Sequence, residues 1–132
     1  MSSEFLLEVF SIKIKIKGYL KNETEKTTEN FEIFGIKNKE KITYIIDGTK
    51  YKLNLKEKNI NLIRETEEFI HSMVFIPEKT TDTIYYIKEY KSEIPIKIHT
   101  KYIKEVNNHI EIAYKTIDNE IEYIYNIEMS DV

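Results

Sequence analysis

A strict alternation of apolar and charged residues near the start of the chain constrains its fold more than any other feature. Residues of one parity are Phe10, Ile12, Ile14 and Ile16, and those of the other are Lys13, Lys15 and Lys17. Successive side chains of a β-strand point to opposite faces, so this pattern predicts a strand with one buried and one solvated face. We expect it to run over Glu8–Leu20, with Gly18 marking a bend or bulge.

Similar strand patterns recur along the whole chain. Isoleucine, tyrosine and threonine abound whereas Ala113 is the only alanine, a composition that favours strands over helices. Turn signals recur about every eight to twelve residues, which is typical of a sandwich or barrel. We expect an all-β fold of about ten strands, the later ones over Thr27–Ile36, Lys41–Ile46, Thr49–Leu55, Ile60–Arg64, Phe69–Ile76, Thr83–Tyr90, Ile94–Ile103, His109–Ile117 and Glu120–Met129.

Three local signals predict how strands begin, end or pair. Asp47-Gly48 is the strongest hairpin signal, because a two-residue turn of this kind requires positive φ. Asp118 and Asn119 also tolerate positive φ and are expected to form the last turn. Pro95 lacks an amide hydrogen, so it predicts an exposed edge or a bulge in its strand.

Charges on the first and last strands favour closure into a barrel. The lysines of the first strand match the acidic face of the last, formed by Glu120, Glu122 and Glu128. In an up-and-down barrel these two strands are neighbours, and opposed charges across them stabilise the pairing. We expect Lys15 to face Glu122 across this seam. The alternative is that both faces are solvated edges, since strand lysines also prevent edge-to-edge aggregation.

Length, charge and composition narrow the class of protein. The 132 residues suffice for one β-barrel domain spanning 1–132, with residues 1–7 as a loose N-terminal segment. The chain has no cysteine, which fits a cytoplasmic location, and no stretch resembling a signal peptide or membrane span. Its net charge of -3 argues against sequence-independent nucleic-acid binding. We expect no membrane or nucleic-acid partner, and a monomer or homodimer.

The order of segments from about Phe10 to Met129 resembles the YwiB-like family of small bacterial proteins of uncharacterised function. The most specific stretch is Leu62-Ile63-Arg64 followed by His71-Ser72-Met73-Val74-Phe75. Further likenesses are Ile42-Thr43-Tyr44 and Glu93-Ile94-Pro95-Ile96 leading to Thr100. The resemblance implies a closed antiparallel barrel of the calycin type, similar in shape to lipocalins, with about eight to ten strands.

Two departures from the family pattern fall in turns. Glu89-Tyr90-Lys91-Ser92 replaces the usual Thr-Pro-Tyr-Gly, and Glu65 replaces the glycine that usually follows Arg64. The turns are therefore expected to differ in type, and no role attached to those motif residues is carried over to this chain.

Arg64 is the strongest candidate for a ligand contact. It is the only arginine and shares strand parity with Ile60 and Leu62, which predicts that it points into the barrel. A buried guanidinium there needs a carboxylate or phosphate partner. Tyr123 and Tyr125, on the apolar face of the last strand, can add hydroxyl groups. The alternative is that Arg64 pairs with a structural glutamate or lies on the surface.

The histidines are too dispersed to predict a metal site. His71, His99 and His109 lie on or beside three different strands, without the short spacing that builds a site from one element. His71 shares parity with Met73 and Phe75, which predicts an interior position. A hydrogen-bonded core histidine is the alternative to a ligand contact there.

Signatures of catalysis are missing from the sequence. Its three glycines, Gly18, Gly35 and Gly48, are too scattered for a phosphate-binding loop. Ser72 lies in an expected strand and not on the strand-to-helix turn that serine hydrolases use. We therefore assign no catalytic residue, metal ligand or cofactor.

We expect a non-catalytic barrel that binds a small amphipathic or anionic molecule in its lumen. The expected ligand contacts are Arg64, His71, Met73, Phe75, Tyr123 and Tyr125. One alternative is a protein-interaction barrel whose interior is filled by side chains. Another is an enzyme acting on a small acidic substrate, which would require two or more of Arg64, His71 and nearby carboxylates to converge.

Overall fold

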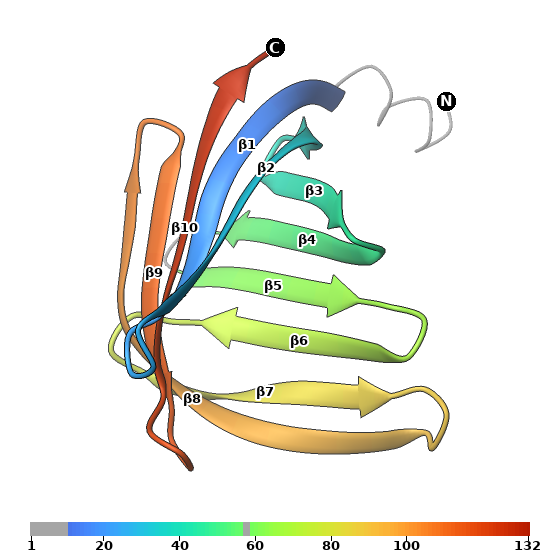
Figure 1. The fold of residues 1–132 in the computed structure, drawn as a ribbon, viewed down its shortest axis with the longest axis vertical. Helices are drawn as coiled ribbons and strands as arrows, with labels where there is room; N and C mark the ends of the chain where they lie inside the picture. The colour runs from blue at the N-terminus through green and yellow to red at the C-terminus, as the bar shows by residue number, and fades with distance from the viewer. Residues whose placement is uncertain (1–10, 57–58) are drawn as a thin grey trace.

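Ten antiparallel strands make up the fold (Figure 1). The computed structural model describes residues 11–56 and 59–132, so the expected loose segment 1–7 and the start of the first strand lie outside the described residues. The strands are β1 (Ser11–Asn22), β2 (Thr27–Asn38), β3 (Lys41–Ile46), β4 (Thr49–Lys56), β5 (Asn59–Glu65), β6 (Phe69–Phe75), β7 (Thr80–Ile87), β8 (Ser92–Val106), β9 (His109–Thr116) and β10 (Glu122–Asp131).

The strands close into a barrel by the simplest possible topology. Each strand pairs with its neighbours in the chain, and β1 also pairs with β10. The expected closed antiparallel barrel is therefore confirmed. The strand bounds differ from the expected ones mostly by one to three residues at the ends, because fraying and pairing partners decide where a strand stops.

Alternation places one face of every strand in the interior. On β1, Ile14 and Ile16 are buried while Lys13, Lys15 and Lys17 are exposed. Ile12, expected on the buried face, is 58% exposed, and Phe10 lies outside the described residues. The same parity rule holds on β10, where Tyr125, Ile127 and Met129 are buried. The fully buried core comprises mainly aliphatic side chains with one phenylalanine: Ile16, Ile42, Leu53, Ile60, Phe75, Ile98, Ile110, Ile112 and Ile127.

No bulge occurs at Gly18, and a close approach of two neighbours explains the glycine there. Its register with Phe31 on β2 and Ile127 on β10 continues without a shift on either side. A Cβ atom at this position would lie 2.5 Å from the Asn126 carbonyl oxygen and 2.6 Å from Cζ of Phe31. Glycine is required here because two neighbours approach the backbone too closely for any side chain.

Both expected turns occur where the sequence predicts them, but in the second the positive φ falls on a different residue. Asp47 and Gly48 have φ values of 47° and 79° and join β3 to β4 as a two-residue hairpin. In the turn between β9 and β10, positive φ falls on Glu120, at 54°, and not on Asp118 or Asn119. The turn residues extend to Ile121, whose carbonyl accepts a hydrogen bond from the Thr116 amide.

Closure of the barrel occurs at the expected seam but in a different register. Lys15 faces Ser130 on β10 and forms its ion pair with Glu32 on β2, at 2.6 Å. Glu122 pairs with Lys101 on β8. The expected Lys15–Glu122 contact is therefore wrong, because the register of β1 against β10 places Glu122 beyond the last residue of β1 that is paired.

Two pairs of neighbouring strands separate toward one end of the barrel. β2 pairs with β3 only through Gly35–Asn38, and β8 pairs with β9 only from Ile98 onward. Pro95 lies in the part of β8 that has β7 on one side and no paired strand on the β9 side. This local edge tolerates a residue without an amide hydrogen, as the sequence predicts.

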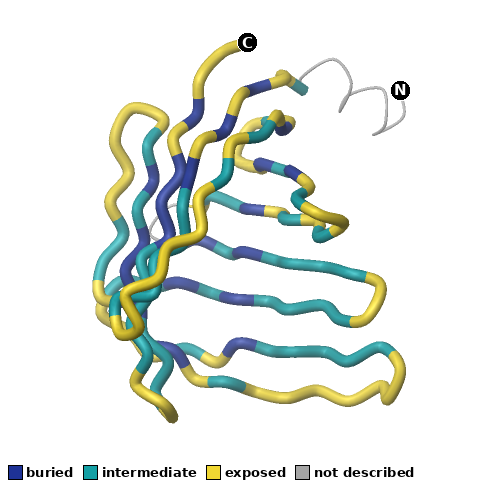
Figure 2. Tube along the Cα trace, viewed as in Figure 1, coloured by how far each residue is buried: buried dark blue, intermediate teal, exposed yellow. Residues whose placement is uncertain are grey.

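The interior is consequently packed at one end and open at the other. Figure 2 shows buried residues concentrated where β4 to β8 approach β1, β9 and β10, whereas the turns of the β3–β4, β5–β6 and β7–β8 hairpins are exposed. Aliphatic residues fill the end that carries the β2–β3, β4–β5, β6–β7 and β8–β9 connections. The other end holds the cavity.

Candidate functional site

A cavity of about 820 Å³ occupies the open half of the barrel. Its floor consists of buried side chains, among them Tyr44, Leu62, Met73 and Tyr125. Its wall comes from strands all around the barrel, because every second side chain of each strand points into the interior. The volume lies within the range of about 300 to 1,000 Å³ that is usual for small-molecule sites.

Arg64 is in this wall, as its strand parity predicts. It lies on β5 opposite Tyr51 of β4 and His71 of β6. Its Nη2 donates a hydrogen bond of 2.9 Å to Nδ1 of His71, and its guanidinium lies 5.9 Å from the centre of the Phe69 ring. Its Nε is buried and has no hydrogen-bond partner among the described residues.

No carboxylate neutralises the charge of Arg64 within the described chain. The ion pairs there all involve lysines, and all of them lie on the outside of the barrel or at its turns. Burying a cation without a partner is costly. The expected alternative of a structural glutamate partner is therefore not what this arrangement shows.

His71 is the second polar group beside the cavity. Burial, together with the positive charge of Arg64, lowers the pKa of His71 to about 4. Its Nε2 lies 3.5 Å from Oγ1 of Thr83, and that hydroxyl donates to the Ile96 carbonyl at 3.0 Å. His71 is thus a neutral side chain held between an arginine and a threonine.

Tyrosines supply most of the remaining polar surface. The Tyr44 and Tyr125 hydroxyls hydrogen-bond to each other across the interior, and burial raises the pKa of both. Tyr44 also stacks on Tyr51 with ring centres 4.8 Å apart, and Tyr114 stacks on Tyr123 at 5.3 Å. These rings make the wall both apolar and capable of hydrogen bonding.

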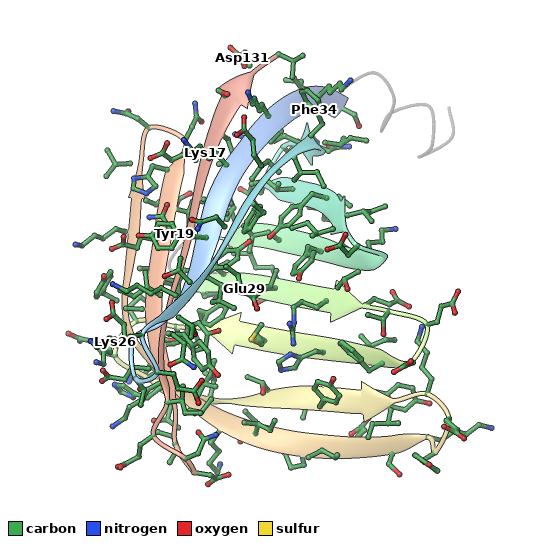
Figure 3. The ribbon with its side chains drawn as sticks, viewed as in Figure 1. Lys17, Tyr19, Lys26, Glu29, Phe34 and Asp131 are labelled. Carbon is green, nitrogen blue, oxygen red and sulfur yellow. The ribbon has the colours of Figure 1, made fainter. Side chains whose placement is uncertain are left out.

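The rim of the cavity is acidic, in contrast to its interior. Glu29, Asp47 and Asp118 line it from β2, the β3–β4 turn and the β9–β10 turn, and all three are exposed. In Figure 3 the labelled Glu29 projects from β2 where this strand has left β3. The cationic group is therefore inside and the anionic groups are at the entrance.

Five of the six expected ligand contacts line the cavity. They are Arg64, His71, Met73, Tyr123 and Tyr125. Phe75 lies outside its lining: it is fully buried in the packed half and contacts the Tyr114 ring at 5.0 Å. Its position in the strand predicted that it points inward. It could not predict whether the side chain lines the cavity or lies in the packed end of the barrel.

Sequence reasoning missed several lining residues that strand parity could have identified. Tyr44, Tyr51 and Tyr85 each share parity with an inward neighbour, as Tyr51 does with Leu53. Thr83 carries no signal of its own, because threonine is common on both faces of strands. Its contact with His71 depends on how β6 pairs with β7, where His71 faces Tyr85, two residues further along β7.

Other kinds of site have no support in the described part of the chain. No group of three or more histidine and acidic side chains is placed to hold a metal ion there. Within residues 11–56 and 59–132, no helix is long and apolar enough to cross a membrane. Arg64 and His71 do converge, which is what the enzyme alternative requires, and no described carboxylate joins them by a hydrogen bond or ion pair.

Comparisons with known proteins support the fold. No model of a protein family matches the chain, and no curated protein sequence matches it. Among solved structures, the chain is similar to the ywiB protein from Bacillus subtilis, with a TM-score of 0.64 and 16% identity over 92% of each chain. At this level of identity the likeness concerns the fold alone. The barrel therefore has a YwiB-like fold.

Proposed function

We propose that this barrel binds a small amphipathic anion in its lumen, with Arg64 holding the anionic group. One observation carries the proposal: the Arg64 side chain lies in the cavity wall, and among residues 11–56 and 59–132 its buried Nε has no hydrogen-bond partner and no carboxylate is paired to it. An anion entering the cavity would supply both the missing acceptor and the missing charge.

The rest of the cavity fits the apolar part of such a ligand. Leu62, Met73 and Ile98 form its deeper wall together with the tyrosine rings. Pockets for small organic molecules combine an apolar lining with few polar groups that fix orientation. The acidic rim would disfavour anions bound superficially, so the anionic group is favoured only at Arg64.

Binding has more support than the two alternatives. A barrel that works only through its outer face has no need for a cavity of about 820 Å³. An enzyme acting on an acidic substrate would need a proton acceptor or nucleophile beside Arg64, and the neighbouring His71 has its Nδ1 lone pair engaged. The YwiB-like fold adds the further proposal that the chain belongs to that family of calycin-type barrels.

Calorimetric titration with decanoate and with decan-1-ol tests this proposal. The two share an apolar chain, but only decanoate carries a charge. Arg64→Gln should weaken decanoate binding by about 10- to 100-fold, as expected for loss of a charge-assisted hydrogen bond. It should leave the binding of decan-1-ol unchanged.

Lys17→Gln is the matched control, because Lys17 is exposed on the outer face of β1. It removes one positive charge and should leave decanoate affinity unaltered. Native mass spectrometry of the purified protein should also show a small molecule that is lost in the arginine variant. Equal affinity of wild type and Arg64→Gln for decanoate would contradict the proposal.

A further inference from the structure

The contact between Arg64 and His71 fixes the protonation state of the histidine. A guanidinium carries only donors, so Nδ1 of His71 must accept the 2.9 Å hydrogen bond. The ring proton is then on Nε2, toward Oγ1 of Thr83. Protonating Nδ1 would place two donors against each other, so this contact exists only while His71 is neutral.

No group facing His71 offers it a negative charge. Arg64 faces it from β5, and Tyr85 and Thr83 face it from β7, with the Tyr85 ring centre 5.1 Å from the imidazole. Phe69 and Met73 are its inward neighbours on β6. The carboxylates of the cavity are all at the rim, so within the described chain His71 has a cation and neutral groups around it.

An anion that contacts both side chains must change this arrangement. It would accept from Nη2 and Nε of Arg64, and the His71 Nδ1 would lose its donor. A hydrogen bond from His71 to the same anion requires a proton on Nδ1. Because Oγ1 of Thr83 donates its only proton to the Ile96 carbonyl, it can only accept from Nε2. Nε2 therefore keeps its proton, and Nδ1 takes a second one from solvent. The headgroup would then face two positive charges, and only a dianion leaves the buried group electrically neutral.

We propose that the headgroup bound in the lumen is a phosphate monoester, held as a dianion by Arg64 and by a His71 that becomes protonated on binding. This inference rests on the proposed function and specifies its ligand class. A carboxylate or sulfonate needs only Arg64 and leaves the Arg64–His71 hydrogen bond in place. A phosphate monoester, with a second pKa of about 6, is a dianion at neutral pH.

Histidine NMR of the wild-type protein tests the protonation directly. The three rings are titrated between pH 5 and 8, alone and saturated with decyl phosphate, decane-1-sulfonate or decanoate. His71 should be protonated at pH 7 only in the decyl phosphate complex. The ring signals of His99 and His109, which lie on the outer face, should not change when any of the ligands is added.

Affinity measurements provide the second readout. At pH 7, His71→Gln should weaken decyl phosphate binding by about tenfold, the loss expected for a charge-assisted hydrogen bond, and leave decanoate affinity unchanged. Glutamine can accept the Arg64 hydrogen bond without gaining a charge. His99→Gln is the matched control and should change neither affinity.

The outcomes separate this inference from the proposed function. If His71 stays neutral in the decyl phosphate complex, or decyl phosphate binds no more tightly than decane-1-sulfonate, the phosphate assignment is wrong. Arg64-dependent binding of decanoate would still support the proposed function in that case. If Arg64→Gln weakens none of the three anions, both ideas fail.

Discussion

His71 shows how strongly a barrel interior can change the behaviour of one side chain. Burial and the neighbouring Arg64 together lower its pKa to about 4, far below the usual value of 6.5. Among the described residues, the acceptor opposite Nε2 is the Thr83 hydroxyl. The free protein therefore holds this histidine neutral throughout the physiological range.

Stability should depend on pH through His71. Because its folded pKa lies below its unfolded pKa, the unfolded state binds the proton more tightly, and stability is lost as pH falls from about 6.5 to about 4. The full shift is worth about 3 kcal/mol, and partial exposure reduces the expected loss to about 1 to 2 kcal/mol. Above pH 6.5 the group contributes no pH dependence.

Urea unfolding between pH 4 and 7 measures this loss. The profile of His71→Gln should be flatter than that of wild type over this window, while His99→Gln should follow wild type. Titration of carboxylates affects all three proteins equally, so it cancels when the unfolding free energy of a variant is subtracted from that of wild type at each pH. Parallel profiles for wild type and His71→Gln would show that His71 is not protonated preferentially in the unfolded state.

At the scale of the strand, β1 is held tightly between β2 and β10. It pairs with β2 over its whole length and with β10 from Ile14 to Asn22. The absence of a side chain at Gly18 lets the Phe31 ring and the β10 backbone close over it. This contact joins the seam of the barrel to the aromatic wall of the cavity.

Gly18→Ala should destabilise the protein by about 1 to 3 kcal/mol, because the new methyl group would collide with the Asn126 carbonyl. Gly48→Asn is the control: nothing lies within 4 Å of a Cβ there, and asparagine tolerates the positive φ of the β3–β4 turn. Its cost should stay within about 0.5 kcal/mol. Chemical denaturation measures both, and equal costs would argue against the close approach.

The molecule as a whole is a barrel that is packed at one end, here called the base, and open at the other. Its base is formed by aliphatic residues, and its open half is formed by tyrosines, Arg64 and His71. Separation of β2 from β3 and of β8 from β9 widens the open half. Stability should therefore be concentrated in the base, and binding in the open half.

Two leucine substitutions compare the halves. Leu53→Ala removes a fully buried side chain from the base and should cost about 2 to 5 kcal/mol. Leu20→Ala removes a half-buried side chain from the cavity lining, where a space already exists, and should cost about 1 kcal/mol. Thermal or urea unfolding compares them, and similar losses would contradict the division into a packed base and an open half.

Local features of the sequence were enough to predict the strands and their inward faces. Alternation in residues 13–17 and parity around Arg64 and His71 identify the inward side of these strands, because the period of two is a property of the extended backbone itself. Asp47-Gly48 predicts its hairpin for a similar local reason, namely the φ values that the turn requires.

Only the tertiary structure determined three features: the register between β1 and β10, the close contacts that require Gly18, and the point along the barrel where the packed interior gives way to the cavity. Lys15 pairs with Glu32 and not with Glu122, because the first and last strands meet only after the whole barrel has closed. Phe75 and Met73 have the same parity, yet one is in the base and the other in the cavity wall. Their difference arises from where β2 leaves β3 and β8 leaves β9, and no local pattern of β6 encodes it.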